Sequence, residues 1–83
     1  MSSVRDRVVS ILKNHVKAEE SQFVDEADLA KDLGVDSLTL FELILDMEKE
    51  FGCEIPEKEA TAIVSIGSAV SYIESKIADG SAH

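Results

Sequence analysis

Three segments of this 83-residue chain repeat their apolar residues at intervals of three and four: residues 4–17, 37–51 and 65–77. This spacing places the apolar residues on one face of an α-helix, which completes a turn about every 3.6 residues. No stretch alternates apolar and polar residues with a period of two, as a half-buried β-strand does. We therefore expect a single all-α domain, a small bundle of three main helices plus one short helix.

Glycine, proline and serine mark the expected ends of these helices. Gly52 suits the end of the second helix, and Pro56 suits the first turn of a short third helix over about residues 56–62. Ser65 is the expected cap of the last helix. Gly67 is expected to weaken that helix by about 1 kcal/mol relative to alanine.

A long loop, residues 18–36, joins the first two helices. Connections of this length are uncommon in compact domains and are often functional. We expect a short helical turn over residues 26–31 and a special backbone conformation at Gly34. Four apolar residues of the loop can anchor it to the core: Phe23, Val24, Leu29 and Leu33. The tail, residues 78–83, is expected to be frayed.

The net charge of −9 is unevenly distributed. Residues 1–18 carry four cations and one acid, whereas residues 19–62 carry fourteen acids and three lysines. An acidic surface repels nucleic acid and anionic membranes and attracts partners with basic patches. A solvated surface that keeps a small domain soluble is the simpler interpretation of the charge alone.

The chain offers little for a disulfide or a membrane anchor. Cys53 is the only cysteine, so no internal disulfide can form. The longest unbroken apolar run has three residues, which excludes a transmembrane helix. No apolar run near the start resembles a signal peptide. We expect a cytoplasmic monomer without stable membrane insertion.

The segment 37–51 carries more apolar residues than one core face needs. At about 100° per residue, one stripe consists of Leu40, Leu43, Ile44, Met47 and Phe51. A second stripe, rotated by about 130°, consists of Leu38, Phe41 and Leu45. Either the long loop covers the second stripe, or the stripe is exposed to partners that have apolar pockets with basic rims. The pattern does not choose between these interpretations.

Ser37 stands at the start of this segment, in a context that disfavours a serine hydrolase. The nucleophile elbow needs a glycine on both sides, and the window from Val35 to Thr39 has none. Apart from the terminal His83, the only histidine is His15, so a catalytic triad is disfavoured. The spacing of the acids and the single cysteine also fit neither an EF-hand nor a zinc site. Serine is a preferred helix-cap residue, so an ordinary cap is one interpretation of Ser37. The N–H groups and the dipole at a helix start also favour an esterified phosphate there.

An ordered set of residues resembles the acyl carrier proteins. The pieces are Leu33-Gly34-x-Asp36-Ser37-Leu38, Glu42-Leu43, Glu48, Phe51, Glu54-Ile55-Pro56 and Ile63. The Asp-Ser-Leu triplet alone is a weak signal. The whole set, in this order and in an acidic chain of this length, is specific. The resemblance implies a carrier that is not itself catalytic. The residue spacing itself predicts no metal site.

The resemblance also implies a cofactor and partners. A phosphopantetheinyl transferase (holo-carrier synthase) would move 4′-phosphopantetheine from coenzyme A onto Ser37. The arm would carry acyl groups as thioesters to acyltransferases, ketosynthases, reductases or other enzymes of fatty acid, specialised lipid or polyketide biosynthesis. The implied partner contacts are Asp36, Leu38, Phe41, Glu42, Leu45, Asp46 and Glu48. The implied acyl cavity is lined by Leu43, Ile44, Met47, Ile55, Ile63, Ile66 and Ala69.

The sequence departs from the usual family pattern at three positions of the second helix. Thr39 replaces a common acid, Phe41 replaces a smaller valine, and Lys49 replaces a glutamate. These departures leave the pathway and the partner enzymes open. Two other hypotheses remain: a non-covalent acidic helical adaptor in which Ser37 is only a cap, and an aminoacyl carrier of similar fold.

Overall fold

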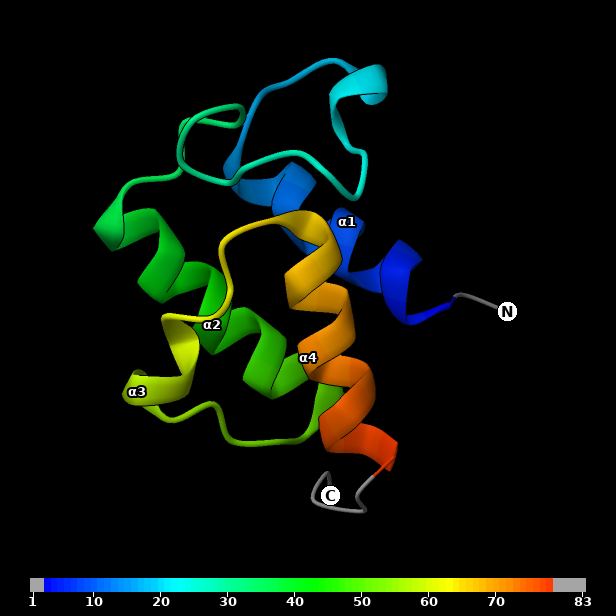
Figure 1. The fold of residues 1–83 in the computed structure, drawn as a ribbon, viewed down its shortest axis with the longest axis vertical. Helices are drawn as coiled ribbons and strands as arrows, with labels where there is room; N and C mark the ends of the chain where they lie inside the picture. The colour runs from blue at the N-terminus through cyan, green and yellow to red at the C-terminus, as the bar shows by residue number, and fades with distance from the viewer. Residues whose placement is uncertain (1–2, 79–83) are drawn as a thin grey trace.

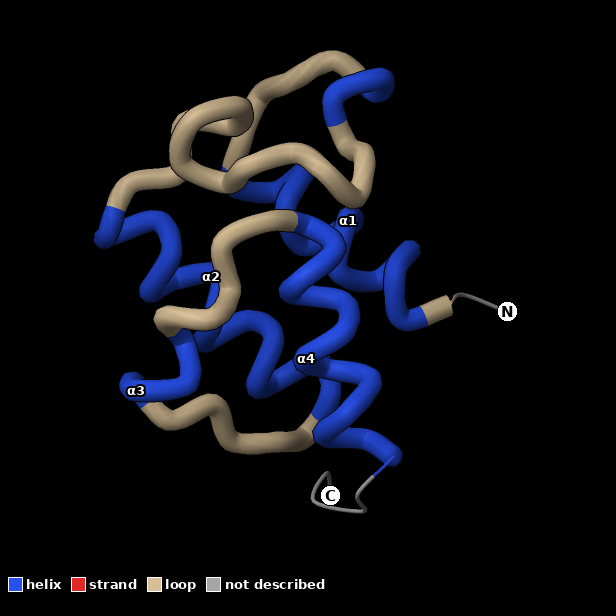
Figure 2. Tube along the Cα trace, viewed as in Figure 1, coloured by secondary structure: helices blue, strands red, loops and turns tan. Residues whose placement is uncertain are grey.

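The computed structural model describes residues 3–78, and the described part is helical (Figure 1). Its elements in chain order are α1 (Val4–His15), the 3₁₀ helix η1 (Glu20–Gln22), α2 (Ser37–Phe51), α3 (Glu57–Ala60) and α4 (Ile66–Ala78). Residues 3–78 contain no strand (Figure 2). The predicted bundle of three long helices and one short helix is confirmed.

The helix ends lie close to their predicted positions. The predicted range of α2 is confirmed, and Gly52 ends it in the left-handed conformation at φ 64°. The first helix ends at His15, two residues earlier than predicted, because the backbone of Val16 is extended. The last helix reaches Ala78, and the rest of the predicted frayed tail lies outside the described residues.

The short helix α3 begins after Pro56, whose extended backbone precedes the first helical residue. It is shorter than the predicted range of 56–62. Ser65 caps α4 as predicted, since its hydroxyl oxygen accepts the N–H of Ser68 at 3.1 Å.

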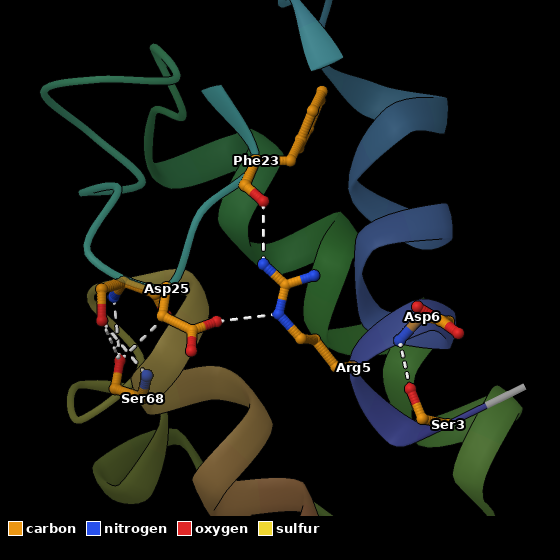
Figure 3. Close-up of polar contacts among 7 residues, drawn as sticks. Ser3, Arg5, Asp6, Phe23, Asp25 and Ser68 are labelled. Atoms are coloured by element: carbon orange, nitrogen blue, oxygen red, sulfur yellow. Dashed lines mark hydrogen bonds and ion pairs between the residues drawn. The ribbon is translucent and has the colours of Figure 1, made fainter. Parts of the chain in front are cut away.

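The long loop is fastened to α1 by Arg5, as Figure 3 shows. The Arg5 guanidinium donates to Asp25 Oδ1 through Nε and to the carbonyl oxygen of Phe23 through Nη2, both at 2.9 Å. On the other side, the Gly67 N–H donates to the Asp25 carbonyl at 2.9 Å. A Cβ at position 67 would lie 3.1 Å from that carbonyl oxygen. Gly67 therefore allows the loop to approach the start of α4 closely, a role that helix propensity alone does not reveal.

Backbone hydrogen bonds continue this attachment. Ile66 N–H donates to Ala27 O at 3.2 Å, and Leu29 N–H donates to Val64 O at 2.9 Å. The helical turn expected over 26–31 is displaced: a turn closes from Asp32 N–H to Asp28 O at 2.9 Å. The 3₁₀ helix η1 was not predicted.

The core is aliphatic and lies between α1, α2 and α4, covered at one end by the loop. The side chains of Leu43, Ile66 and Ile73 are almost fully buried. The loop contributes Phe23, Leu29 and Leu33 to the core, as predicted. The expectation for Val24 is wrong, because its side chain is 44% exposed.

Candidate functional site

Asp36 caps α2. Its Oδ1 accepts the N–H of Thr39 at 2.8 Å, and its backbone is extended. This bond from the Thr39 N–H lowers the pKa of the Asp36 carboxyl below its ordinary value. The interpretation of Ser37 as the cap is therefore wrong. The residue before it has the extended backbone that a cap requires, and Ser37 is the first helical residue.

Ser37 is exposed at the tip where the loop meets α2. Within residues 3–78, no side chain or backbone group forms a hydrogen bond with its hydroxyl. The hydroxyl is therefore accessible and is not committed to capping. An exposed serine at a helix start fits the attachment of a phosphate group, since the adjacent N–H groups and the helix dipole favour negative charge there.

The second apolar stripe of α2 is exposed. The exposed fractions are 68% for Leu38, 59% for Phe41 and 40% for Leu45. Glu42 lies on the same side of the helix and is also exposed. The loop does not cover this stripe, so the alternative that the sequence left open is excluded. On the core stripe, four side chains are buried and Leu40 is half-buried: Leu43, Ile44, Met47 and Phe51.

Besides Asp36, three acids of the expected partner surface have contacts within the chain. Asp46 Oδ2 lies 2.6 Å from Nε2 of His15 on α1, and Glu42 Oε1 lies 3.8 Å from Nδ1 of the same ring. Glu48 Oε2 accepts the backbone N–H of Ile55 at 2.8 Å. The carboxylates of Asp46 and Glu48 thus anchor α2 to α1 and to the segment before α3. A partner role for either residue stays a prediction.

The core contains an apolar pocket of only about 10 Å³, enough for about one water molecule. Four of the predicted cavity residues line it: Leu43, Met47, Ile63 and Ala69. The other three, Ile44, Ile55 and Ile66, are buried but do not line it. This volume is too small for an acyl chain, so a chain could enter the pocket only if the helices moved apart.

A larger groove of about 270 Å³ lies where the end of the loop, the start of α2 and the α3–α4 link meet. Its lining consists of Asp28, Leu29, Ala30, Lys31, Val35, Leu40, Ile63 and Val64. Sequence reasoning missed this groove because its walls come from three segments far apart in the chain. No sequence signal marked it, since Leu40 was assigned to the core stripe of α2.

Comparison with known proteins assigns the family. The profile of the family described as "Phosphopantetheine attachment site" matches residues 4–73. The chain is 45% identical over 76 residues to an acyl carrier protein of Azobacteroides pseudotrichonymphae, covering 90% of this chain and 89% of that protein. The chain belongs to the acyl carrier protein family. Members of this family are carriers.

Further acyl carrier proteins agree with this assignment. One from Bradyrhizobium sp. (strain ORS 278) is 42% identical over 74 residues, covering 89% of this chain and 94% of that protein. The solved structure of the acyl carrier protein from Enterococcus faecalis has a TM-score of 0.76 and 39% identity, covering 87% of this chain and 91% of that one. Across residues 3–78, no helix is long and apolar enough to cross a membrane.

Proposed function

We propose that this protein carries acyl groups on 4′-phosphopantetheine attached to Ser37, and that it acts in the cytoplasm as a substrate of enzymes rather than as an enzyme. The observation that carries the proposal is the exposed, uncommitted hydroxyl of Ser37 beside the capping carboxylate of Asp36. The proposed partners are acyl-processing enzymes in general. The proposal does not choose between fatty acid, specialised lipid and polyketide synthesis.

Attachment requires a transferase to reach Ser37. A bond forms between the Ser37 hydroxyl oxygen and the phosphorus next to the pantetheine of coenzyme A. The bond between that phosphorus and the bridging oxygen of the diphosphate breaks, adenosine 3′,5′-bisphosphate departs, and the hydroxyl proton is released. The attached arm supplies a terminal thiol that holds an acyl group as a thioester. This chain contributes the accessible oxygen and a rigid helix start, and Asp36 keeps the first turn of α2 ordered.

The exposed face of α2 is the proposed docking surface, made of Asp36, Leu38, Phe41, Glu42 and Leu45. Three exposed apolar side chains flanked by acids suit enzymes that present an apolar pocket with a basic rim. The charge of −9 favours fast encounter with such enzymes at low salt. Proposed partners are the phosphopantetheinyl transferase and acyl-processing enzymes.

A mass measurement tests the attachment. Incubation with coenzyme A and a phosphopantetheinyl transferase is expected to add the mass of one phosphopantetheine. Ser37→Ala is expected to abolish the gain, whereas Ser71→Ala, an exposed serine on α4, is expected to retain it. A wild-type protein that stays unmodified would instead support the acidic adaptor hypothesis. The group found on the thiol in cells separates an acyl carrier from an aminoacyl carrier.

A further inference from the structure

The groove beside Ser37 has mostly apolar walls and one cation. Leu29, Val35, Leu40, Ile63 and Val64 are among its lining residues, together with Lys31. Val35 precedes Ser37 by two residues, and Leu40 follows it by three, about one helical turn. A group attached to Ser37 therefore emerges next to the groove. With about 270 Å³ of open space against about 10 Å³ in the core pocket, the groove can receive such a group without movement of the helices.

Lys31 lines this groove and carries a positive charge that is unpaired within residues 3–78. Its side chain is exposed, and no described residue forms an ion pair or hydrogen bond with its ammonium group. The acids nearest in sequence are engaged by the backbone of the turn. Asp28 Oδ1 accepts the N–H groups of Ala30 and Lys31 at 2.9 and 2.8 Å, and Asp32 Oδ2 accepts the N–H of Asp28 at 2.7 Å. These bonds order the turn on which Lys31 lies.

The negative charge around the groove distinguishes Lys31 as the residue that attracts an anionic group. The chain carries −9 overall, and Asp28 also lines the groove. A negatively charged acyl group would be repelled by most of this surface, and Lys31 is the only cation in the groove lining. The Asp28 carboxylate accepts two backbone N–H groups, whereas the Lys31 ammonium group has no such partner among the described residues. Apolar walls with this one cation are complementary to a short aliphatic chain that ends in a carboxylate.

We propose that the groove receives the acyl group on the Ser37 arm, and that Lys31 selects acyl groups with a terminal carboxylate over neutral ones of equal length. Lys31 is then a specificity-determining residue. This inference rests on the proposed attachment at Ser37. It assigns a short, charged cargo to the larger groove rather than to the small core pocket.

The test compares two cargoes of equal carbon number. The transferase loads Ser37 from succinyl-coenzyme A or from butyryl-coenzyme A, and mass spectrometry confirms each product. Amide chemical shifts are then recorded relative to the protein with an unacylated arm. The succinyl cargo is expected to shift the amides of Ala30, Lys31 and Val64 more than the butyryl cargo does. High salt is expected to reduce the difference, because it screens exposed charges.

Variants separate selection by Lys31 from a general effect of charge. Lys31→Gln is expected to lose the difference between the cargoes, and Lys31→Arg is expected to retain it. Lys49→Gln, at an exposed lysine in the last turn of α2, is the matched control and is expected to behave as wild type. Circular dichroism checks that each variant is folded.

Three results would overturn the inference. They are equal shifts for both cargoes, a difference that survives in Lys31→Gln, and shifts confined to core-pocket residues such as Met47 and Ala69. Absence of any mass gain on wild type is a separate result. It contradicts the proposed attachment itself, and the inference fails with it.

Discussion

Asp36 Oδ1 accepts the Thr39 N–H at 2.8 Å, so the residue before Ser37 caps the helix that Ser37 begins. Capping and attachment are thereby divided between two adjacent side chains. The serine hydroxyl stays available to a transferase while the first turn of α2 remains ordered. The carboxylate at this position has two separable properties, its hydrogen bond and its charge.

Two substitutions separate these properties. Asp36→Ala removes the cap and is expected to lower the melting temperature by a few degrees. Asp36→Asn keeps an oxygen that can accept the Thr39 N–H and is expected to leave the melting temperature close to wild type. Because Asp36 belongs to the proposed docking surface, Asp36→Asn is still expected to slow modification by the transferase. Thermal circular dichroism and the modification rate distinguish the two effects. An equal loss of stability in both variants would contradict the assignment of the cap.

The same contact predicts a dependence on acid. Because the folded-state pKa of Asp36 is lowered, its ionised form stabilises the folded state relative to the unfolded one. This contribution is complete above the ordinary aspartate pKa of about 3.9 and is lost as pH falls through the folded-state pKa. The difference in melting temperature between wild type and Asp36→Ala should therefore shrink in acid. A constant difference across that range would refute the prediction.

The exposed stripe of α2 should affect partners rather than stability. Leu38→Ala and Glu42→Lys are expected to weaken reactions with the transferase about tenfold, while the helical circular dichroism signal stays near wild type. Val24→Ala, in the loop, is the matched control because Val24 is a similarly exposed apolar residue. Unfolding of the Leu38 variant would show that this stripe belongs to the core.

Tyr72 on α4 connects to α3 through a hydrogen bond that its hydroxyl donates to Glu59 Oε1. Burial, with that bond and the charge of Glu59, raises the pKa of the Tyr72 hydroxyl. The protonated form therefore stabilises the folded state fully below the ordinary tyrosine pKa of about 10, and this contribution is lost as pH rises through the folded-state pKa.

The chain suits a direct test, since Tyr72 is the only tyrosine and there is no tryptophan. Tyrosinate absorbance is expected to appear only well above the ordinary pKa while the protein stays folded. Glu59→Gln removes the negative charge and is expected to lower the pKa of Tyr72 only part of the way toward its ordinary value. Burial, the first cause of the shift, remains in this variant. Titration at the ordinary pKa in the folded wild type would contradict the observed contact.

Local sequence signals predicted much of this fold but not its long-range contacts. The range of α2 follows from apolar periodicity and the stop at Gly52. The choice between Asp36 and Ser37 as cap does not, because both residue types cap well and only the backbone conformation decides. The groove could not be predicted, since Lys31, Leu40 and Val64 meet only in the folded chain. The role of Gly67 could not be predicted for the same reason, since its neighbour Asp25 is far away in the sequence.

Gly67 provides a test of how the loop is held. In an exposed helix, Gly→Ala stabilises by about 1 kcal/mol. Here the added Cβ would lie 3.1 Å from Asp25 O and 3.3 Å from Asp25 Cβ, so Asp25 must move to accommodate it. Arg5 holds the Asp25 side chain from the opposite side at 2.9 Å and resists that movement. We therefore expect Gly67→Ala to destabilise the fold by about 1 kcal/mol or more, as overpacking does.

Arg5→Ala decides whether this explanation is correct. Without Arg5, Asp25 can move away from position 67, so Gly67→Ala should cost less in the Arg5→Ala background than in wild type. Denaturant unfolding of the two single variants and the double variant gives this coupling as a double-mutant cycle. Ser71→Ala, at an exposed position of α4, serves as the control for helix propensity. If the two substitutions are additive, the clamp of Asp25 between Arg5 and Gly67 does not determine the packing of the loop.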